Sequence, residues 1–255
     1  MRAEQMRMED ETIRLERVST VYEGERIPAI REVDISVHGG DFVCIVGPNG
    51  SGKTTLLETI NGILRYTSGH GSVFGMEITS NGSAIRKRIG YVIQNFEIDP
   101  LSPFLCKNVV MSGRTGKIGL LRFPEADDWD AVRESMIRVG MERWWSRPIG
   151  KLSGGEFQKI LIARALAQEP DVYLLDEPYA NLDIRSRHEI SELLTEIHVA
   201  GPTLLMVSHD VSSIPSSCTH IIVMDRGSIV GSGSATEVIE SGVIDKALGM
   251  RRPNL

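Results

Sequence analysis

Residues 47–54, GPNGSGKT, carry glycine, lysine and threonine at the spacing of a phosphate-binding loop. The pattern GxxxxGK[ST] arises by chance in roughly one of a hundred chains of this length. Glycines let backbone N–H groups surround phosphate oxygens, a lysine reaches the β- and γ-phosphates, and a threonine hydroxyl binds Mg²⁺. The pattern therefore predicts a nucleotide site rather than a plain glycine-rich turn. Its candidate residues are Gly47, Pro48, Asn49, Gly50, Ser51, Gly52, Lys53, Thr54 and Thr55, with Thr54 also on Mg²⁺.

Two carboxylates end the apolar run of residues 172–178, VYLLDEP. Asp176 could hold the Mg²⁺ shell, and Glu177 could polarise a water molecule. An acidic pair after a strand is commonly just a solvated loop. Together with the loop at 47–54, the pair indicates metal-assisted hydrolysis.

A serine and two glycines in residues 152–158, LSGGEFQ, stand where a helix is expected to begin. The N-terminus of a helix binds anions, so Ser153, Gly154 and Gly155 are candidates for phosphate binding. The alternative is a serine N-cap followed by flexible glycines.

GPNGSGKTT, LSGGEFQ and VYLLDEP, in this order, resemble the Walker A, signature and Walker B motifs of ABC ATPases. The resemblance covers nearly the whole chain. It implies an ATPase that uses ATP and Mg²⁺ and has Glu177 as its general base.

The same resemblance assigns roles to four further residues. Gln94 would contact Mg²⁺ and the attacking water, and His209 would contact the γ-phosphate and orient that water. Asp183 would belong to the D-loop, and Tyr22 would stack on adenine. Taken singly, they would be interpreted as a loop amide, a surface histidine, a helix N-cap and a core or edge-strand tyrosine.

Five residues depart from the family pattern. Tyr179 follows DEP where serine or threonine is usual, and Asn181 stands where a small residue is more common. Glu156, Phe157 and Lys159 vary the tail of the signature. These departures concern the D-loop and the contacts across a dimer, and none removes a phosphate ligand or the base.

Short apolar runs, many of them β-branched, alternate with longer amphipathic segments, as in strands and crossover helices. We expect an α/β fold of the P-loop NTPase type, RecA-like, with a mostly parallel sheet, a small antiparallel β-subdomain and an inserted α-helical subdomain. Core strands are predicted at residues 42–46, 89–93, 172–175 and 203–207, antiparallel strands at 13–22 and 29–37, a helix at 53–64, and a mainly helical insert at 96–168. Ile190, Leu193, Leu194 and Ile197 have the spacing of one helix face.

One ABC ATPase domain is expected over residues 1–255. The nucleotide-binding core and β-subdomain would comprise residues 10–97 and 166–231, the helical subdomain with the signature residues 98–165, and a short tail residues 232–255.

The composition narrows the classes of partner. The 255 residues are 41 % hydrophobic and carry a net charge of −6, which argues against a broad nucleic-acid-binding surface. No stretch of about 18 apolar residues occurs, so we expect a chain that neither crosses a membrane nor is exported. Cys44, Cys106 and Cys218 form no CxxC pair, and His220 beside Cys218 is too little for a metal site.

The family resemblance also implies partners. Two copies would form an ATP-dependent homodimer in which the signature of one completes the phosphate site of the other. Separate permease subunits would hold the dimer at the cytoplasmic face of the membrane, and an extracytoplasmic substrate-binding protein would deliver the cargo.

Two segments resemble one branch of the family. NVVMSGRTGKIGLLRFPEADDW and RVGMERWWSRPIGKLSGGE resemble ATPases of manganese, zinc and iron-chelate importers. Three alternatives stay open: an importer ATPase for cobalamin, a siderophore or another cargo; a soluble ATPase of iron–sulfur cluster assembly; and a module that holds ATP without hydrolysing it. The last would be expected to lack Glu177 or His209, and both are present.

Overall fold

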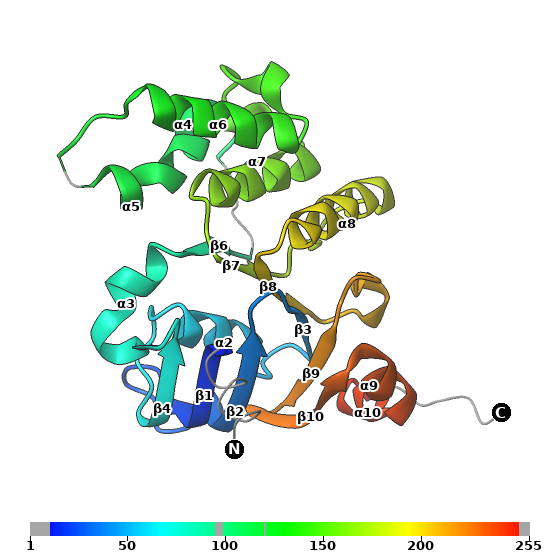
Figure 1. Cartoon of the computed structure of the whole chain (residues 1–255). Coiled ribbons are helices and arrows are strands. Elements are labelled where there is room, and N and C mark those ends of the chain that lie inside the picture. The colour runs from blue at the N-terminus through cyan, green and yellow to red at the C-terminus, as the bar shows by residue number, and fades with distance from the viewer. Residues whose placement is uncertain (1–10, 95–98, 120, 250–255) are drawn as a thin grey trace.

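A six-stranded sheet lies at the centre of the computed structural model, which describes residues 11–94, 99–119 and 121–249 (Figure 1). Its strand order is β10-β9-β3-β8-β7-β6, parallel from β9 to β6 and antiparallel between β10 and β9. The strands are β3 Phe42–Val46, β6 Ile89–Val92, β7 Val172–Asp176, β8 Thr203–Ser208, β9 His220–Asp225 and β10 Ser228–Ser234. Every residue of β3, β7 and β8 is buried, which explains their unbroken apolar sequences. The strands predicted at 42–46, 172–175 and 203–207 are confirmed.

The parallel arrangement sets the position of the candidate chemistry. The carboxyl ends of β3, β6, β7 and β8 meet at one edge of the sheet. The residues that follow these strands include Gly47, Gln94, Glu177 and His209. Residues far apart in the sequence are therefore brought to one edge.

A second sheet, antiparallel and of four strands, has the order β2-β1-β4-β5. It consists of β1 Glu11–Thr20, β2 Ile30–His38, β4 Ser68–Val73 and β5 Met76–Glu77, and α3 Ile78–Arg86 follows β5. The predicted pairing of the first two strands is confirmed, with Leu15 opposite Ile35. One hydrophobic cluster joins both sheets through α2, Lys53–Ile60.

The helix predicted at 53–64 is too long by four residues. Asn61 is the C-cap of α2, and Gly62 follows with a φ of 63°. Glycine adopts this left-handed conformation at little cost and commonly ends helices. The glycine, rather than the apolar pattern, therefore ends α2.

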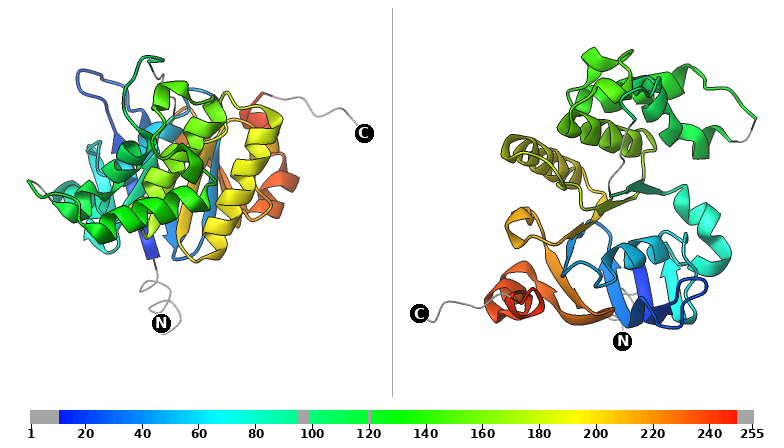
Figure 2. Two further views of the ribbon diagram at one scale, coloured as in Figure 1. Left: turned by 90° about the horizontal axis from the view of Figure 1, so that it is seen from above. Right: turned by 180° about the vertical axis from the view of Figure 1, so that it is seen from behind.

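The helical insert is confirmed for the residues that the structure describes; residues 96–98 and 120 of the predicted range lie outside them. Its elements are α4 Cys106–Met111, the 3-10 turns η1 Ser112–Arg114, η2 Glu142–Trp144 and η3 Ile149–Lys151, and the helices α5 Thr115–Ile118, α6 Ala126–Arg138 and α7 Gly154–Ala167. Figure 2 shows these helices as a separate layer beside the sheets. Val110, Met136 and Ile160 form part of their common core.

Helix α8, Ile184–Val199, connects β7 to β8 and buries the four residues of its predicted apolar face. The turn η4, Val211–Ser213, follows β8. Beyond β10, α9 Ala235–Ser241 and α10 Val243–Ala247 bury Val238 and Ile244. The expected boundary at 165/166 falls within α7, and the one at 231/232 falls within β10, because each element continues across the expected limit. The expected boundary at 97/98 and the expected limits at residues 10 and 255 lie outside the described part of the chain.

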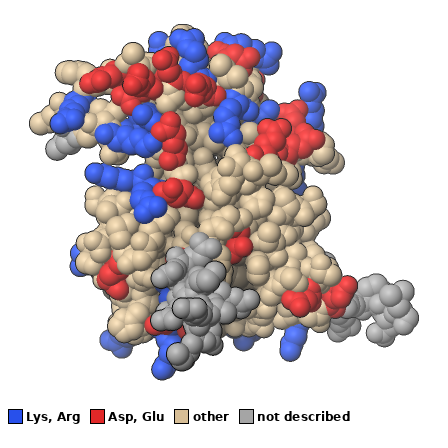
Figure 3. All heavy atoms as spheres, viewed as in Figure 1, with Lys and Arg blue, Asp and Glu red and all other residues tan. Residues whose placement is uncertain are grey.

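The surface and the thiols add three observations. No helix among the described residues is both long and apolar enough to cross a bilayer. On the face drawn in Figure 3, acidic and basic side chains are interspersed over the helical layer. Cys44, Cys106 and Cys218 are buried free thiols.

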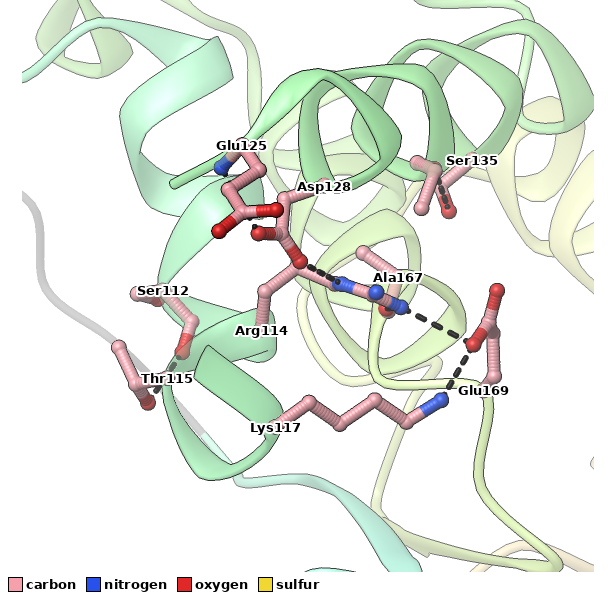
Figure 4. A network of polar contacts seen from close by, with 10 residues as sticks. Ser112, Arg114, Thr115, Lys117, Glu125, Asp128, Ser135, Ala167 and Glu169 are labelled. Carbon is pink, nitrogen blue, oxygen red and sulfur yellow. Dashed lines mark hydrogen bonds and ion pairs between the residues drawn. The ribbon is translucent and has the colours of Figure 1, made fainter. Parts of the chain in front are cut away.

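Arg114 ties the helical layer together, as Figure 4 shows. Its side chain is only 11 % exposed, and its Nε donates to Asp128 Oδ1 at 3.0 Å. Its Nη1 donates to the Ala167 carbonyl at 3.1 Å and to Glu169 Oε2 at 3.0 Å, where Lys117 also binds. One guanidinium thus joins α6 to the end of α7.

We expect Arg114→Met to lower the free energy of unfolding by about 3 kcal/mol, because it removes the buried guanidinium that binds the half-buried Asp128 carboxylate, the Ala167 carbonyl and Glu169. Urea denaturation followed by circular dichroism measures this change. The control Arg185→Met removes an ion pair whose arginine is 89 % exposed, and it should change the free energy of unfolding by less than about 1 kcal/mol. Equal effects of the two variants would contradict a special role for Arg114.

Candidate nucleotide-binding site

The loop between β3 and α2 is shaped by its glycines. Gly52 has a φ of 98° and precedes the first residue of α2. A Cβ at Gly52 would lie 2.6 Å from the Ala29 carbonyl oxygen, and one at Gly47 would lie 2.2 Å from that of Met224. Neither position has room for a side chain. The loop therefore stays close to the protein backbone behind it and presents its own backbone to a ligand.

Lys53 lies inside this loop. Its side chain is buried, and Nζ donates to the carbonyl oxygens of Gly47 and Pro48, both at 2.9 Å. Burial lowers the pKa of Lys53, while the charges of Glu177 and Asp176 oppose that shift. The ammonium group is thus held where an anion bound in the loop would meet it.

A cavity of about 350 Å³ opens beside the loop. It is lined by Tyr22, Ala29, Asn49, Gly50, Gly52, Lys53, Thr54, Thr55, Gln94 and Glu177. The Tyr22 hydroxyl lies 2.9 Å from Thr55 Oγ1, and the residue is 40 % exposed. The structure therefore brings Tyr22 to the rim of the phosphate loop, outside β1.

Asp176, at the end of β7, is buried to 1 % exposure. Burial raises its pKa to about 6, against a hydrogen bond from Thr54; the charge of Glu177 also raises it, and that of Lys53 opposes it. Its Oδ1 has no hydrogen-bond partner among the described residues. A buried carboxylate oxygen of this kind, next to a threonine hydroxyl, is suited to an oxygen-preferring divalent cation.

One carboxylate oxygen of Glu177 contacts two polar side chains. Gln94 Nε2 donates to Glu177 Oε2 at 2.9 Å, and His209 Nδ1 lies 3.1 Å from the same atom. The Glu177 side chain is 9 % exposed. Three residues from the ends of β6, β7 and β8 thus meet at a single carboxylate.

Glu177 and Gln94 also line a second cavity, of about 270 Å³. The other lining residues are Tyr179, Ala180, Asn181, Arg187, Val207, Ser208 and His209. We call this second cavity the outer cavity. Since both cavities share Gln94 and Glu177, the Glu177 carboxylate lies between the phosphate loop and the outer cavity. Glu177 could polarise a water molecule in the outer cavity toward a ligand in the cavity beside the phosphate loop.

The signature residues lie elsewhere. Ser153 caps α7, with its Oγ accepting from Glu156 N at 3.3 Å, and it is exposed. Among the described residues that line the two cavities, Ser153, Gly154 and Gly155 do not occur. The structure of one chain therefore does not bring the signature to its own phosphate loop.

Asp183 and the two D-loop departures differ in their local surroundings. Asp183 Oδ1 accepts from Ser186 N at 2.8 Å and caps α8. Tyr179 is buried in a hydrophobic cluster that contains residues of both the sheet and the helices, and Asn181 has a φ of 58°. Arg187, which the motifs did not indicate, lies 3.8 Å from Asp210 through its Nη1 and lines the outer cavity. Its position four residues after Asp183, one helical turn along α8, was the available signal.

The raised pKa of Asp176 predicts a pH dependence of stability. The pKa of Asp176 in the folded protein, about 6, exceeds the ordinary 3.8. The contribution of the protonated carboxyl to the free energy of unfolding is therefore complete below pH 4 and is lost as pH rises through 6. The difference corresponds to about 3 kcal/mol. Relative to wild type, Asp176→Asn should therefore gain about that much free energy of unfolding between pH 4 and 7.

Urea denaturation at several pH values, without nucleotide or Mg²⁺, measures this gain. Asp130→Asn, at an exposed position of α6, is the control and should follow the wild-type profile. A difference between wild type and Asp176→Asn that stays constant with pH would contradict the assignment.

Comparisons with known proteins agree with this geometry. Residues 30–180 match the family described as ABC transporter. The manganese transport system ATP-binding protein MntA of Synechocystis sp. is 36 % identical over 237 residues, covering 93 % of this chain and 90 % of that protein. The zinc transport system ATP-binding protein TroB of Treponema pallidum is 32 % identical and covers 88 % and 82 %. A dimeric post-hydrolysis structure of the ATP-binding cassette MJ0796, bound to ADP and Pi, has a TM-score of 0.75 at 28 % identity and covers 87 % and 98 %.

Proposed function

This chain belongs to the ABC transporter family, and from that premise we propose that it energises a membrane importer of metal ions or metal chelates. It is an ATPase of that family. The observation that carries the hydrolytic part of the proposal is the meeting of Gln94, His209 and Glu177 beside the phosphate loop. A binding module without turnover would not need this arrangement.

The residues divide the work of hydrolysis. Loop N–H groups and Lys53 neutralise the β- and γ-phosphates. Glu177 accepts a proton from water. His209 contacts both the Glu177 carboxylate and the γ-phosphate and thereby fixes their relative positions. Tyr22, at the rim of the loop, stacks on adenine. Asp183 keeps the start of α8 in place beside the outer cavity.

Thr54, Asp176 and Gln94 would hold Mg²⁺. The unpartnered Oδ1 of Asp176 and the adjacent Thr54 hydroxyl fit this cation. When bound, Mg²⁺ supplies positive charge to the phosphate oxygens. Its charge would also lower the pKa of Asp176 and keep that carboxylate ionised at neutral pH.

A homodimer completes the site. Ser153 and the N-terminus of α7 are exposed and lie away from the phosphate loop of their own chain. Two copies placed head to tail let each Ser153 donate to the phosphates bound by the other. Closure on ATP and reopening after hydrolysis would provide the mechanical stroke.

The stroke acts on separate permease subunits, which hold the dimer at the cytoplasmic face of the membrane. An extracytoplasmic binding protein delivers the cargo to them. Manganese and zinc stand in the names of relatives that match most of this chain, and this supports metal import. It favours import over iron–sulfur cluster assembly.

The proposal is tested in the native host. A strain that lacks the gene is complemented with wild type or Glu177→Gln, and uptake of radiolabelled manganese, zinc, iron chelate and cobalamin is measured. Loss of metal uptake, restored by wild type alone, supports the proposal. Loss of cobalamin uptake alone would refute the cargo, and capture of the tagged chain with cluster-scaffold proteins and no permease would refute transport.

A further inference from the structure

Trp144 is linked to the signature serine through one carboxylate. Its indole Nε1 donates to Glu156 Oε1 at 2.9 Å. The other oxygen of that carboxylate, Oε2, accepts from the backbone N–H of Ser153 at 2.9 Å. Glu156 N in turn donates to Ser153 Oγ at 3.3 Å. A side chain nine residues before Ser153 thus sets the cap of α7.

The capping box formed by Ser153 and Glu156 leaves hydrogen-bond donors available for a ligand. Since Ser153 Oγ accepts from Glu156 N, its hydroxyl proton can still be donated to a ligand. The N–H groups of Gly154 and Gly155 belong to the first turn and have no acceptor within the helix. One short segment, of which Ser153 and Gly154 are exposed, therefore keeps three donors that the helix itself does not use.

The glutamate at 156, a departure from the family signature, matches this arrangement. A carboxylate can accept one hydrogen bond on each oxygen, whereas a glutamine amide has a single acceptor oxygen. The hydrogen bonds from Ser153 and Trp144, with the charge of Arg147, outweigh burial and keep the pKa of Glu156 below its usual value. The acceptor therefore remains ionised at neutral pH.

Trp144 is itself held in place. The Arg143 guanidinium lies over its ring at 3.6 Å, and Arg147 lies 5.4 Å from the ring centre. Arg147 Nη2 also donates to the Lys151 carbonyl at 2.9 Å, two residues before Ser153. The indole and the segment that leads into α7 are thus fastened to each other at two points.

The N-terminus of α7 also contacts the start of α8. A Cβ at Gly155 would lie 2.5 Å from Ser186 Oγ, and Ser186 binds the D-loop residue Asp183 through both N and Oγ. A displacement of Ser153 would therefore also displace Ser186 and the D-loop residue Asp183 that it binds.

From these contacts we propose that Trp144, acting through Glu156, is a positioning residue that pre-sets the Ser153 segment for the ATP bound by a second copy of this chain. The inference rests on the proposed two-copy site. Trp144 touches neither nucleotide cavity, so it acts on closure of the dimer and not on ATP binding by the single chain.

Trp144→Phe tests this role in the full chain, because it keeps the aromatic ring and removes the N–H donor. It is combined with Glu177→Gln to prevent turnover. We expect an ATP-dependent dimerisation constant weakened by about 10²-fold, because the homodimer loses one hydrogen bond to a charged group, worth about tenfold, at each of its two sites. ATP affinity, measured at protein concentrations below dimerisation, should change less than about twofold, since the loop is untouched.

Trp145→Phe in the same background is the matched control. The Trp145 ring packs against Trp129 and lies near Arg133, so its truncation should leave dimerisation unchanged. Glu156→Gln is the second variant and should weaken dimerisation like Trp144→Phe. Adding it to Trp144→Phe should produce less than the product of the two separate effects, because both act on the same contact.

The outcomes are distinguishable by sedimentation velocity with and without ATP. If Glu177→Gln alone forms no ATP-dependent dimer, the proposed function fails and the inference with it. If that dimer forms and Trp144→Phe leaves it unchanged, the positioning role is refuted. The same holds if Trp144→Phe lowers the ATP affinity of the single chain as much as it lowers dimerisation. Should Trp144→Phe fail to fold, Glu156→Gln decides: an unchanged dimer overturns the role.

Discussion

Glu177→Gln is expected to lower the rate constant for ATP hydrolysis by about 10²- to 10⁴-fold, the usual contribution of a general base. The amide oxygen of glutamine can still accept from Gln94 and His209, which now both bind Glu177 Oε2. The geometry of the three side chains should therefore persist while the proton acceptor is lost. ATP binding should remain, and the ATP-bound dimer should accumulate.

Phosphate release measures the rate, and size-exclusion chromatography with ATP measures the dimer. The control Glu196→Gln changes an exposed glutamate of α8 and should hydrolyse ATP at the wild-type rate. A Glu177→Gln protein with normal turnover would mean that another group is the base.

Lys53→Ala should weaken ATP binding by about 10²-fold, which corresponds to the upper range for hydrogen bonds to a charged group. The ammonium lies within the loop and donates to the carbonyl oxygens of Gly47 and Pro48. Burial lowers the pKa of Lys53, and the negative charges of Glu177 and Asp176 raise it against that effect. Without it, the phosphates of ATP would meet two carboxylates with no compensating charge from the loop.

Isothermal titration calorimetry with ATP and Mg²⁺ measures this loss. Lys246→Ala, in α10, is a control of the same chemistry and should bind ATP like wild type. Nearly unchanged affinity in Lys53→Ala would show that the backbone of the loop alone holds the phosphates.

Burial explains which parts of the fold could be predicted from sequence. Strands β3, β7 and β8 are apolar throughout because both faces are covered, so their limits could be predicted within one residue. Strands β4 and β10, with the sequences SGHGSV and SIVGSGS, have weak strand propensity and form because they pair with β1 and β9. Such strands depend on tertiary context, which the local sequence does not contain.

The site divides in the same way. Motif spacing could predict Lys53, Asp176 and Glu177 as site residues, because each motif lies at the carboxyl end of an apolar strand and these ends meet at one edge of the sheet. The bond between Trp144 and Glu156 could not be predicted, since it joins a 3-10 turn to a helix across an intervening loop. Aromatic residues at such positions are usually interpreted as core, and no local pattern indicates an indole hydrogen bond.

The backbone of Glu177 has a φ of 47°, in the left-handed region. For a residue with a Cβ this conformation costs about 1–2 kcal/mol, and glycine would avoid most of that cost. Selection for heat resistance alone would therefore favour glycine at this position and discard the carboxylate. A more thermostable variant of this ATPase should therefore keep Glu177 and carry its stabilising substitutions at other positions.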